Sequence, residues 1–187
     1  GTFLYILFGM SPFDAINHAV AALSTGGFST RAESIGYYNS TAIEMVTVIL
    51  MLLGSTNFFV HLLLLKGKFK EFISHCEVRL MLFLLALFVP ILTVLLMNGV
   101  YSNVPVSLRA ALFQAVSALT TTGFQTVESF AAWTPAMMFL MILLMLIGGG
   151  AGSTAGGLKI YRVYVMLKEI LWKLVRDAHP DRVVFTE

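Results

Sequence analysis

Residues 22–30 read ALSTGGFST and residues 118–126 read ALTTTGFQT, and this repeat is the strongest architectural signal in the chain. Shifted by 96 positions, residues 15–30 match residues 111–126 at nine of 16 positions. Each copy follows a short segment opened by a proline and lies between longer apolar runs. Because a repeated unit defines an architecture, we predict two parallel copies of one unit: span, short half-helix, Thr-x-Gly-Phe loop, span.

The composition is that of a membrane protein. Hydrophobic side chains make up 58% of the 187 residues, against about 45–50% in an ordinary globular domain. Residues 80–97 contain no charge over 18 positions, which is typical of a membrane span. Only 12% of residues are charged and Cys76 is the single cysteine. These values exclude a disordered chain, a nucleic-acid binder with a basic face and a disulfide scaffold, and they predict an all-α membrane protein.

The segment before each repeated loop is too short to cross a bilayer. Ser11 and Pro12 have the residue types of a helix start. A helix over residues 12–23 would be about 18 Å long, whereas the hydrocarbon core is about 30 Å thick. Pro105 opens the second short segment, which extends to Leu119. We therefore expect two re-entrant helices whose loops face protein or water, because lipid does not tolerate non-helical backbone.

The repeated loops have the chemistry of a cation site made from backbone groups. A helix C-terminus carries partial negative charge, and loop carbonyls replace the hydration shell of an alkali ion in potassium pores. Neither loop contains a carboxylate, which argues against a side-chain ring for divalent cations. The alternative is that the glycines serve only as helix C-caps. The expected carbonyl ligands belong to Thr25, Gly26, Gly27, Thr121, Thr122 and Gly123.

The cations gather in two segments of the chain. One comprises Lys66, Lys68, Lys70 and Arg79, and the other comprises Lys159, Arg162, Lys168, Lys173, Arg176 and Arg182. The positive-inside rule places loop 66–79 and the C-terminus in the cytoplasm, and the loops near residues 30, 100 and 130 outside. The alternative is that the basic segments are merely solvated.

Two apolar runs are interrupted by small and polar residues. Run 43–65 is broken near its middle by Gly54, Ser55, Thr56 and Asn57. These residues could line water, or they could form a kink packed on a neighbouring helix. Run 135–147 ends at GGGAGSTAGG, residues 148–157, which lacks the Gly-Lys-Ser/Thr ending of a phosphate loop. We interpret it as a site of close helix packing and a flexible break.

Three other readings of the sequence have less support. His18, His61, His75 and His179 have no spacing typical of metal ligands. An intramembrane serine protease using Ser153 and a histidine would need a nucleophile and base held together, and no motif indicates this. A secondary cation symporter with broken helices is the remaining alternative, although its repeats are often inverted.

Several motifs in the same order resemble a known family. The segments TGGF, TTGF, GYYN (36–39), GSTNFFVH (54–61) and GGGAGSTAGGLK (148–159) are similar to those of the Trk/Ktr/HKT potassium transporters, bacterial TrkH type. The resemblance implies potassium uptake through a channel-like pore, with K+ as the transported ion and no covalently bound cofactor. Family members have four repeats in one polypeptide. The chain would then hold the third repeat, truncated at its first span, in residues 1–78 and the complete fourth repeat in residues 79–187.

The resemblance also implies roles for particular residues. Gly27 and Gly123 match the key filter glycines, residues 54–57 match an intramembrane gating loop, and Arg162 matches an arginine that contributes to the barrier of the gate. The alternative for Arg162 is an interfacial anchor beside Lys159. A multi-pass protein of the inner (plasma) membrane is implied, with a homodimer, cytosolic RCK-type nucleotide-binding subunits and the lipid bilayer as partners. Two loops cannot close a four-fold ring, so we expect the protein to continue upstream and the chain alone not to conduct.

Overall fold

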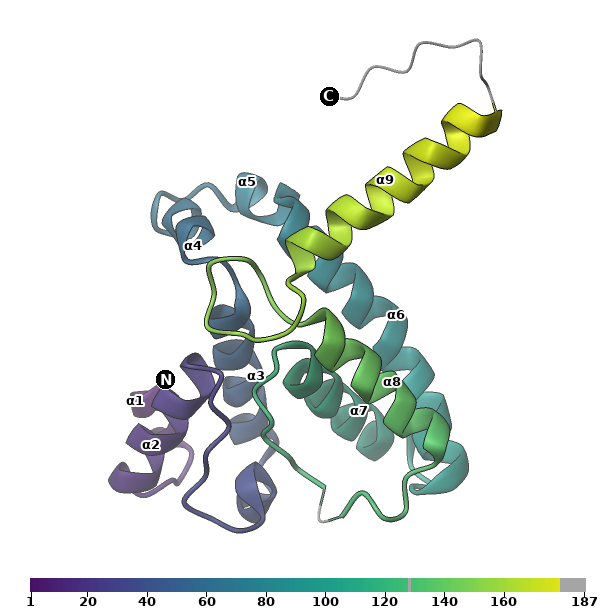
Figure 1. Ribbon diagram of the computed structural model, residues 1–187. Helices are drawn as coiled ribbons and strands as arrows, with labels where there is room; N and C mark the ends of the chain where they lie inside the picture. Colours follow the sequence, from purple (N-terminus) through teal and green to yellow (C-terminus); the bar gives the residue numbers. More distant parts are fainter. Residues whose placement is uncertain (128, 179–187) are drawn as a thin grey trace.

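The computed structural model describes residues 1–127 and 129–178, and within them the chain is helical and contains no strand (Figure 1). The elements are α1 (Thr2–Leu7), α2 (Pro12–Leu23), η1 (Ser34–Tyr38), α3 (Thr41–Ser55), α4 (Phe58–Leu65), α5 (Phe69–Ser74), α6 (Cys76–Gly99), α7 (Val104–Leu119), α8 (Pro135–Ile147) and α9 (Ile160–Ala178). His179 and Arg182, named in the sequence analysis, lie outside the described residues.

The two short helices form where the sequence predicts them. α2 begins at Pro12 and ends at Leu23, and the Ser11 side chain accepts a hydrogen bond from the Asp14 backbone amide at 3.1 Å. That bond satisfies one of the amides that a helix N-terminus leaves without a partner. α7 has Pro105 in its first turn and ends at Leu119. Both half-helices are therefore confirmed as helices.

One long helix and one bent pair have the length of a membrane span. α6 has 24 residues, which corresponds to about 36 Å, and it is the only single described helix both long and apolar enough to cross a bilayer. α3 and α4 are long and apolar enough to cross a bilayer only when they are taken together, but the helix axis turns by 113° between them. Segment 66–79, which the sequence predicted as a polar loop, is largely helical, because it contains α5 and the first turn of α6.

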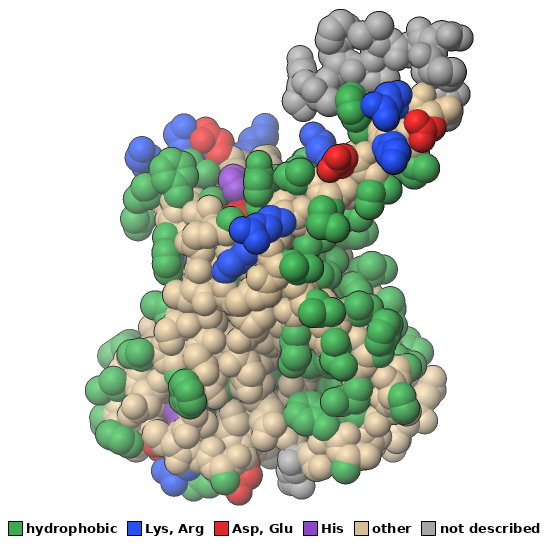
Figure 2. Space-filling view, viewed as in Figure 1, with side chains coloured by type: hydrophobic (Ala, Val, Ile, Leu, Met, Phe, Trp, Pro, Cys, Tyr) green, Lys and Arg blue, Asp and Glu red, His purple; other side chains and the backbone are tan. Residues whose placement is uncertain are grey.

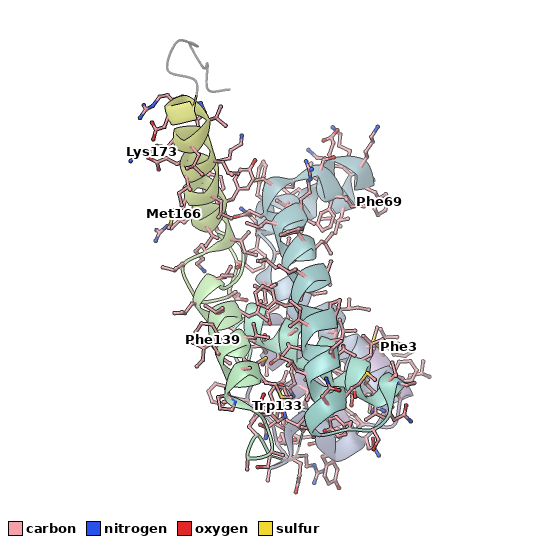
Figure 3. All side chains as sticks on the ribbon, turned by 90° about the vertical axis from the view of Figure 1, so that its right-hand side faces the viewer. Phe3, Phe69, Trp133, Phe139, Met166 and Lys173 are labelled. Atoms are coloured by element: carbon pink, nitrogen blue, oxygen red, sulfur yellow. The ribbon has the colours of Figure 1, made fainter. Side chains whose placement is uncertain are left out.

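Charged and apolar side chains occupy different zones of the surface. Lysines and arginines gather at the end where α4, α5 and α9 lie, and the hydrophobic side chains visible below that end lie mainly along the flanks of the molecule (Figures 1 and 2). Lys173 of α9 and Phe69 of α5 lie at one end of the molecule, whereas Trp133 lies toward the other (Figure 3). Both basic segments therefore share one end, as a common cytoplasmic side would require.

An ion pair joins α3, in the first predicted repeat, to α7, in the second. α3 packs against α7, and the guanidinium of Arg109 on α7 donates to both carboxylate oxygens of Glu44 on α3, at 2.6 and 2.8 Å. Glu44 is 4% exposed. A bidentate pair of this kind fixes distance and orientation together, so it aligns α7 against α3.

We expect Glu44→Ala and Arg109→Ala each to lower the free energy of unfolding of the intact protein. The cost should be about 2 kcal/mol, below the 3–5 kcal/mol of a fully buried pair that loses one partner, because Arg109 retains some water contact. Thermal unfolding in detergent measures this. The double variant should lose about 1 kcal/mol less than the sum of the single variants; strict additivity would contradict the coupling.

Candidate functional site

Helix α2 ends in a tight cap that places a threonine in the left-handed conformation. The amide of Thr25 donates to the carbonyl of Ala22 at 3.2 Å, and the amide of Gly26 donates to that of Ala21 at 2.8 Å. This pair of bonds is the Schellman pattern, in which glycine normally occupies the left-handed position. Here that position is Thr25, with φ of 51°.

Helix α7 ends in the same way. The amide of Thr121 donates to the carbonyl of Ala118 at 3.0 Å, and the amide of Thr122 donates to that of Ser117 at 3.0 Å. Thr121 has φ of 54°. A β-branched residue in this region is a true outlier that costs about 1–3 kcal/mol and persists only where the surroundings enforce it. We call residues 24–30 the first loop and residues 120–126 the second loop.

The glycines of the two loops lie beyond the left-handed capping positions. Gly27 and Gly123 lie two residues after the capping threonines, with φ of 68° and 87°. The amide of Gly27 also donates to the carbonyl of Ala21 at 3.4 Å, but Thr25 and Thr121 occupy the left-handed positions of the caps. The glycines instead permit a second left-handed turn in each loop, immediately before the phenylalanine.

The two loops touch each other at Gly27. A Cβ atom on Gly27 would lie 1.9 Å from the carbonyl oxygen of Thr122, so only hydrogen fits there. A Cβ atom on Gly123 would meet nothing within 4 Å. Carbonyl-bearing backbone from both repeats is thus concentrated at one place, as a shared site would require.

The polar residues between α3 and α4 end one helix and begin the next. The hydroxyls of Ser55 and Thr56 donate to the carbonyl of Leu52 at 3.0 and 2.7 Å. The side-chain oxygen of Asn57 accepts from the amide of Phe59 at 2.9 Å, which caps α4. The predicted interruption of the helix is confirmed, and we call residues 56–57 the break.

The segment from residue 148 to residue 159, which we call the glycine loop, packs against this break. The amide of Gly150 donates to the carbonyl of Ser55 at 2.8 Å, and the amide of Phe58 donates to the carbonyl of Gly152 at 3.3 Å. A Cβ atom on Gly150 would lie 3.1 Å from the Ser55 carbonyl oxygen. The glycine loop therefore supplies partners for backbone groups that the end of α3 leaves free.

The glycine loop also contacts both capping threonines. The hydroxyl of Thr154 lies 3.1 Å from that of Thr25, 3.0 Å from the carbonyl oxygen of Gly54 and 3.2 Å from that of Leu23. The amide of Gly156 donates to the hydroxyl of Thr121 at 2.6 Å. One polar network thus connects both repeated loops with the end of α3, which the sequence alone did not reveal.

A buried carboxylate ties the glycine loop to α6. Glu77, 4% exposed, accepts a hydrogen bond from the amide of Ala151 at 2.7 Å through Oε1. Its Oε2 has no hydrogen-bond partner among the described residues and lies 4.0 Å from Nδ1 of His75. Sequence reasoning missed Glu77 and Arg109. The available signal was a charged side chain near the start of an apolar helix: Glu77 in the first turn of α6 and Arg109 in the second turn of α7.

The two cations near the glycine loop differ in their contacts. The ammonium of Lys159 donates to the carbonyl of Ala155 inside that loop. Arg162 is exposed on the first turn of α9, and its guanidinium forms neither a hydrogen bond nor an ion pair with residues 1–127 or 129–178. Its expected position opposite residues 54–57 stays a prediction.

Among the described residues, the other candidate groups do not assemble into a chemical site. The hydroxyl of Ser153 donates to the carbonyl of Gly150 at 2.7 Å rather than to a histidine. In the part of the chain that the structure describes, no three His, Cys, Asp or Glu side chains gather as metal ligands would.

Comparison with known proteins gives consistent matches. The profile of the TrkH family, described as "Cation transport protein", matches residues 6–187. The chain is 38% identical over 177 residues to the Trk system potassium uptake protein TrkH of Escherichia coli (strain K12), covering 94% of the chain and 36% of the relative. It is 35% identical over 182 residues to the protein of that name from Halomonas elongata, covering 96% of the chain and 37% of the relative.

A solved structure extends this similarity to the fold. The crystal structure of the potassium transporter TrkH from Vibrio parahaemolyticus superimposes with a TM-score of 0.91 at 34% identity. The match covers 100% of the chain and 40% of that protein. The chain therefore spans about two fifths of the length of the proteins it matches.

We expect Gly27→Ala to destabilise the intact protein more than Gly123→Ala. Both substitutions impose a left-handed non-glycine residue, at about 1–3 kcal/mol. Only the methyl at Gly27 also collides with backbone, at the Thr122 carbonyl. Thermal unfolding in detergent compares the two variants directly. Equal losses would show that the contact between the loops relaxes freely.

Proposed function

The chain belongs to the TrkH family of cation transport proteins, and from this we propose that it forms two repeats around a potassium-conducting pore. The family is one of membrane transporters rather than enzymes, and the all-helical fold matches it. Residues 1–78 would form one repeat and residues 79–187 the next. A secondary symporter with broken helices is less well supported, because the matched relatives are potassium uptake proteins.

The observation that carries the proposal is the pair of matched loops in contact at Gly27. Carbonyl groups converging from several loops can replace the water around a dehydrated potassium ion. The proposed ligands are the carbonyls of Thr25, Gly26, Gly27, Thr121, Thr122 and Gly123. The threonine caps support this role, because strained backbone persists where function selects it.

The break and the glycine loop are the proposed gate. The glycine loop contacts the capping threonines through Thr154 and Gly156, and Thr154 also bonds the Gly54 carbonyl just before the break. Residues 54–57 would obstruct the ion path, and Arg162 would oppose a passing cation from the second repeat. A fixed positive charge repels a cation most strongly where water is scarce.

The surroundings of the pore follow from the charge distribution and the family. The basic end that carries α5 and α9 would face the cytoplasm of a cell with the pore in its inner membrane, since cytoplasmic loops are rich in lysine and arginine. That end would meet cytosolic RCK-type nucleotide-binding subunits, and the complete protein would form a homodimer. Potassium is the proposed transported ion, without a bound cofactor.

We expect Gly123→Ser to lower the preference for potassium over sodium in the intact protein. Serine at this left-handed position re-aims the neighbouring carbonyls at a cost of about 1–3 kcal/mol. Since about 1.4 kcal/mol is tenfold in an equilibrium constant, the selectivity ratio should fall about tenfold. Ion flux into proteoliposomes measures it, with Gly67→Ser, a left-handed glycine outside the loops, as control. Unchanged selectivity would remove Gly123 from the filter.

We expect Arg162→Ala, and separately deletion of residues 54–57, to raise basal potassium flux. At 4 Å, two unit charges repel by about 4 kcal/mol at an effective dielectric constant near 20, against about 1 kcal/mol in water. Relief of the larger value would speed permeation by more than about a hundredfold. Lys173→Ala, another cation on α9, is the control. If both variants express normally and conduct as before, residues 54–57 form only a kink and Arg162 only an anchor.

A further inference from the structure

The far end of the first loop is tied back onto the helix from which the loop starts. The hydroxyl of Thr30 donates to one carboxylate oxygen of Asp14 at 2.6 Å, and the guanidinium of Arg31 donates to the other at 2.9 Å. Asp14 lies in the first turn of α2 and is 4% exposed. The bonds to Asp14 raise the pKa of Arg31. The loop thus runs between two fixed points on α2: its capped end and Asp14.

His18 adds a second tie from the middle of α2. The ring is fully buried, with Nδ1 2.7 Å from the Asp14 carbonyl oxygen and Nε2 2.8 Å from the hydroxyl of Ser29. A carbonyl oxygen can only accept, so Nδ1 donates to Asp14, and in the tautomer that carries its hydrogen on Nδ1 the Nε2 atom accepts from the Ser29 hydroxyl. The Ser29 oxygen in turn accepts from the amide of Arg31 at 3.0 Å. Every polar atom of this chain of bonds has a partner.

The same imidazole also touches the second loop. Its ring stacks on that of Phe124, with centroids 5.8 Å apart and planes at 29°, and meets the Tyr38 ring edge-on at 5.8 Å. Phe124 is 1% exposed and directly follows Gly123. His18 therefore contacts both loops, by one hydrogen bond to the first and by its ring face to the second.

The second repeat holds its loop by other means. At the positions that match Asp14, His18, Ser29 and Arg31, it has Ala110, Gln114, Gln125 and Val127. The amide nitrogen of Gln114 is buried without a partner among the described residues. Instead, the hydroxyl of Ser117 donates to the carbonyl of Phe124 at 2.7 Å, where the first repeat has Ala21.

We propose that His18 is a positioning residue, which sets the spacing between the two loops and so determines selectivity among alkali cations. This inference rests on the proposed filter. Selectivity by carbonyls depends on their number and separation. A side chain that binds the outer end of one loop and packs on the other controls that separation without touching the ion.

The test compares Ser29→Ala, Ser29→Thr and His18→Phe in the intact protein, reconstituted in vesicles with potassium, rubidium or sodium as the permeant ion. Ser29→Ala removes only the hydroxyl that bonds Nε2, while Ser29→Thr retains a hydroxyl. His18→Phe keeps an aromatic ring and removes both hydrogen bonds. We expect Ser29→Ala and His18→Phe to lower the potassium-to-sodium ratio about five- to tenfold, which is about the factor that one lost hydrogen bond of this kind contributes. Ser29→Thr should retain the native ratio.

Gln114→Leu is the matched control, because it alters the corresponding position of the second repeat, where no such tie exists. It should leave the ratio unchanged. Equal loss of flux for all three ions in Ser29→Ala and His18→Phe would assign His18 to stability alone and overturn the proposal, as would an unchanged ratio in folded Ser29→Ala. Gly123→Ser distinguishes failure of the proposed filter from failure of the proposed role of His18. If Gly123→Ser alters selectivity while Ser29→Ala does not, the filter stands and the role of His18 fails.

Discussion

The structure depends on one constraint: helices that end between other elements leave backbone amides and carbonyls without partners along the helix. Such groups must find partners within the chain. α2 and α7 solve this by folding their last carbonyls onto the amides of the loops that follow. α3 ends nearby and has its last carbonyls satisfied by its own hydroxyls and by the glycine loop. The polar and glycine-rich sequence at these three places is the result.

The capping threonines connect this requirement to the proposed function. Glycine would relieve the left-handed strain at Thr25 and Thr121, but it would also remove the hydroxyls that contact Thr154 and Gly156. A shift of the glycine loop away from α3 would release these contacts and the end of α3 together. The loops and the break are therefore mechanically coupled, and Glu77 anchors the same loop to α6 through Ala151.

Sequence reasoning succeeded where local pattern determines structure. Ser11 and Pro12 predicted the start of α2, and residues 54–57 predicted the interruption of a span, because caps and breaks depend on near neighbours. It failed where distant residues meet. Glu44 and Arg109 lie 65 positions apart, and the use of residues 148–159 to satisfy the end of α3 follows only from the tertiary arrangement. The left-handed threonines were equally invisible, since propensity favours glycine at that position.

The two repeats carry the same residues at some matched positions and different residues at others. Positions 25 and 121, and 27 and 123, carry identical residues, and all four have left-handed backbone angles. Positions 18 and 114, and 21 and 117, carry different residues, so the side-chain restraints on the two loops differ. His18 restrains the outer end of one loop, whereas Ser117 holds a carbonyl within the other. One backbone geometry is thus reached by two sets of restraints, so the two loops need not have equal stiffness.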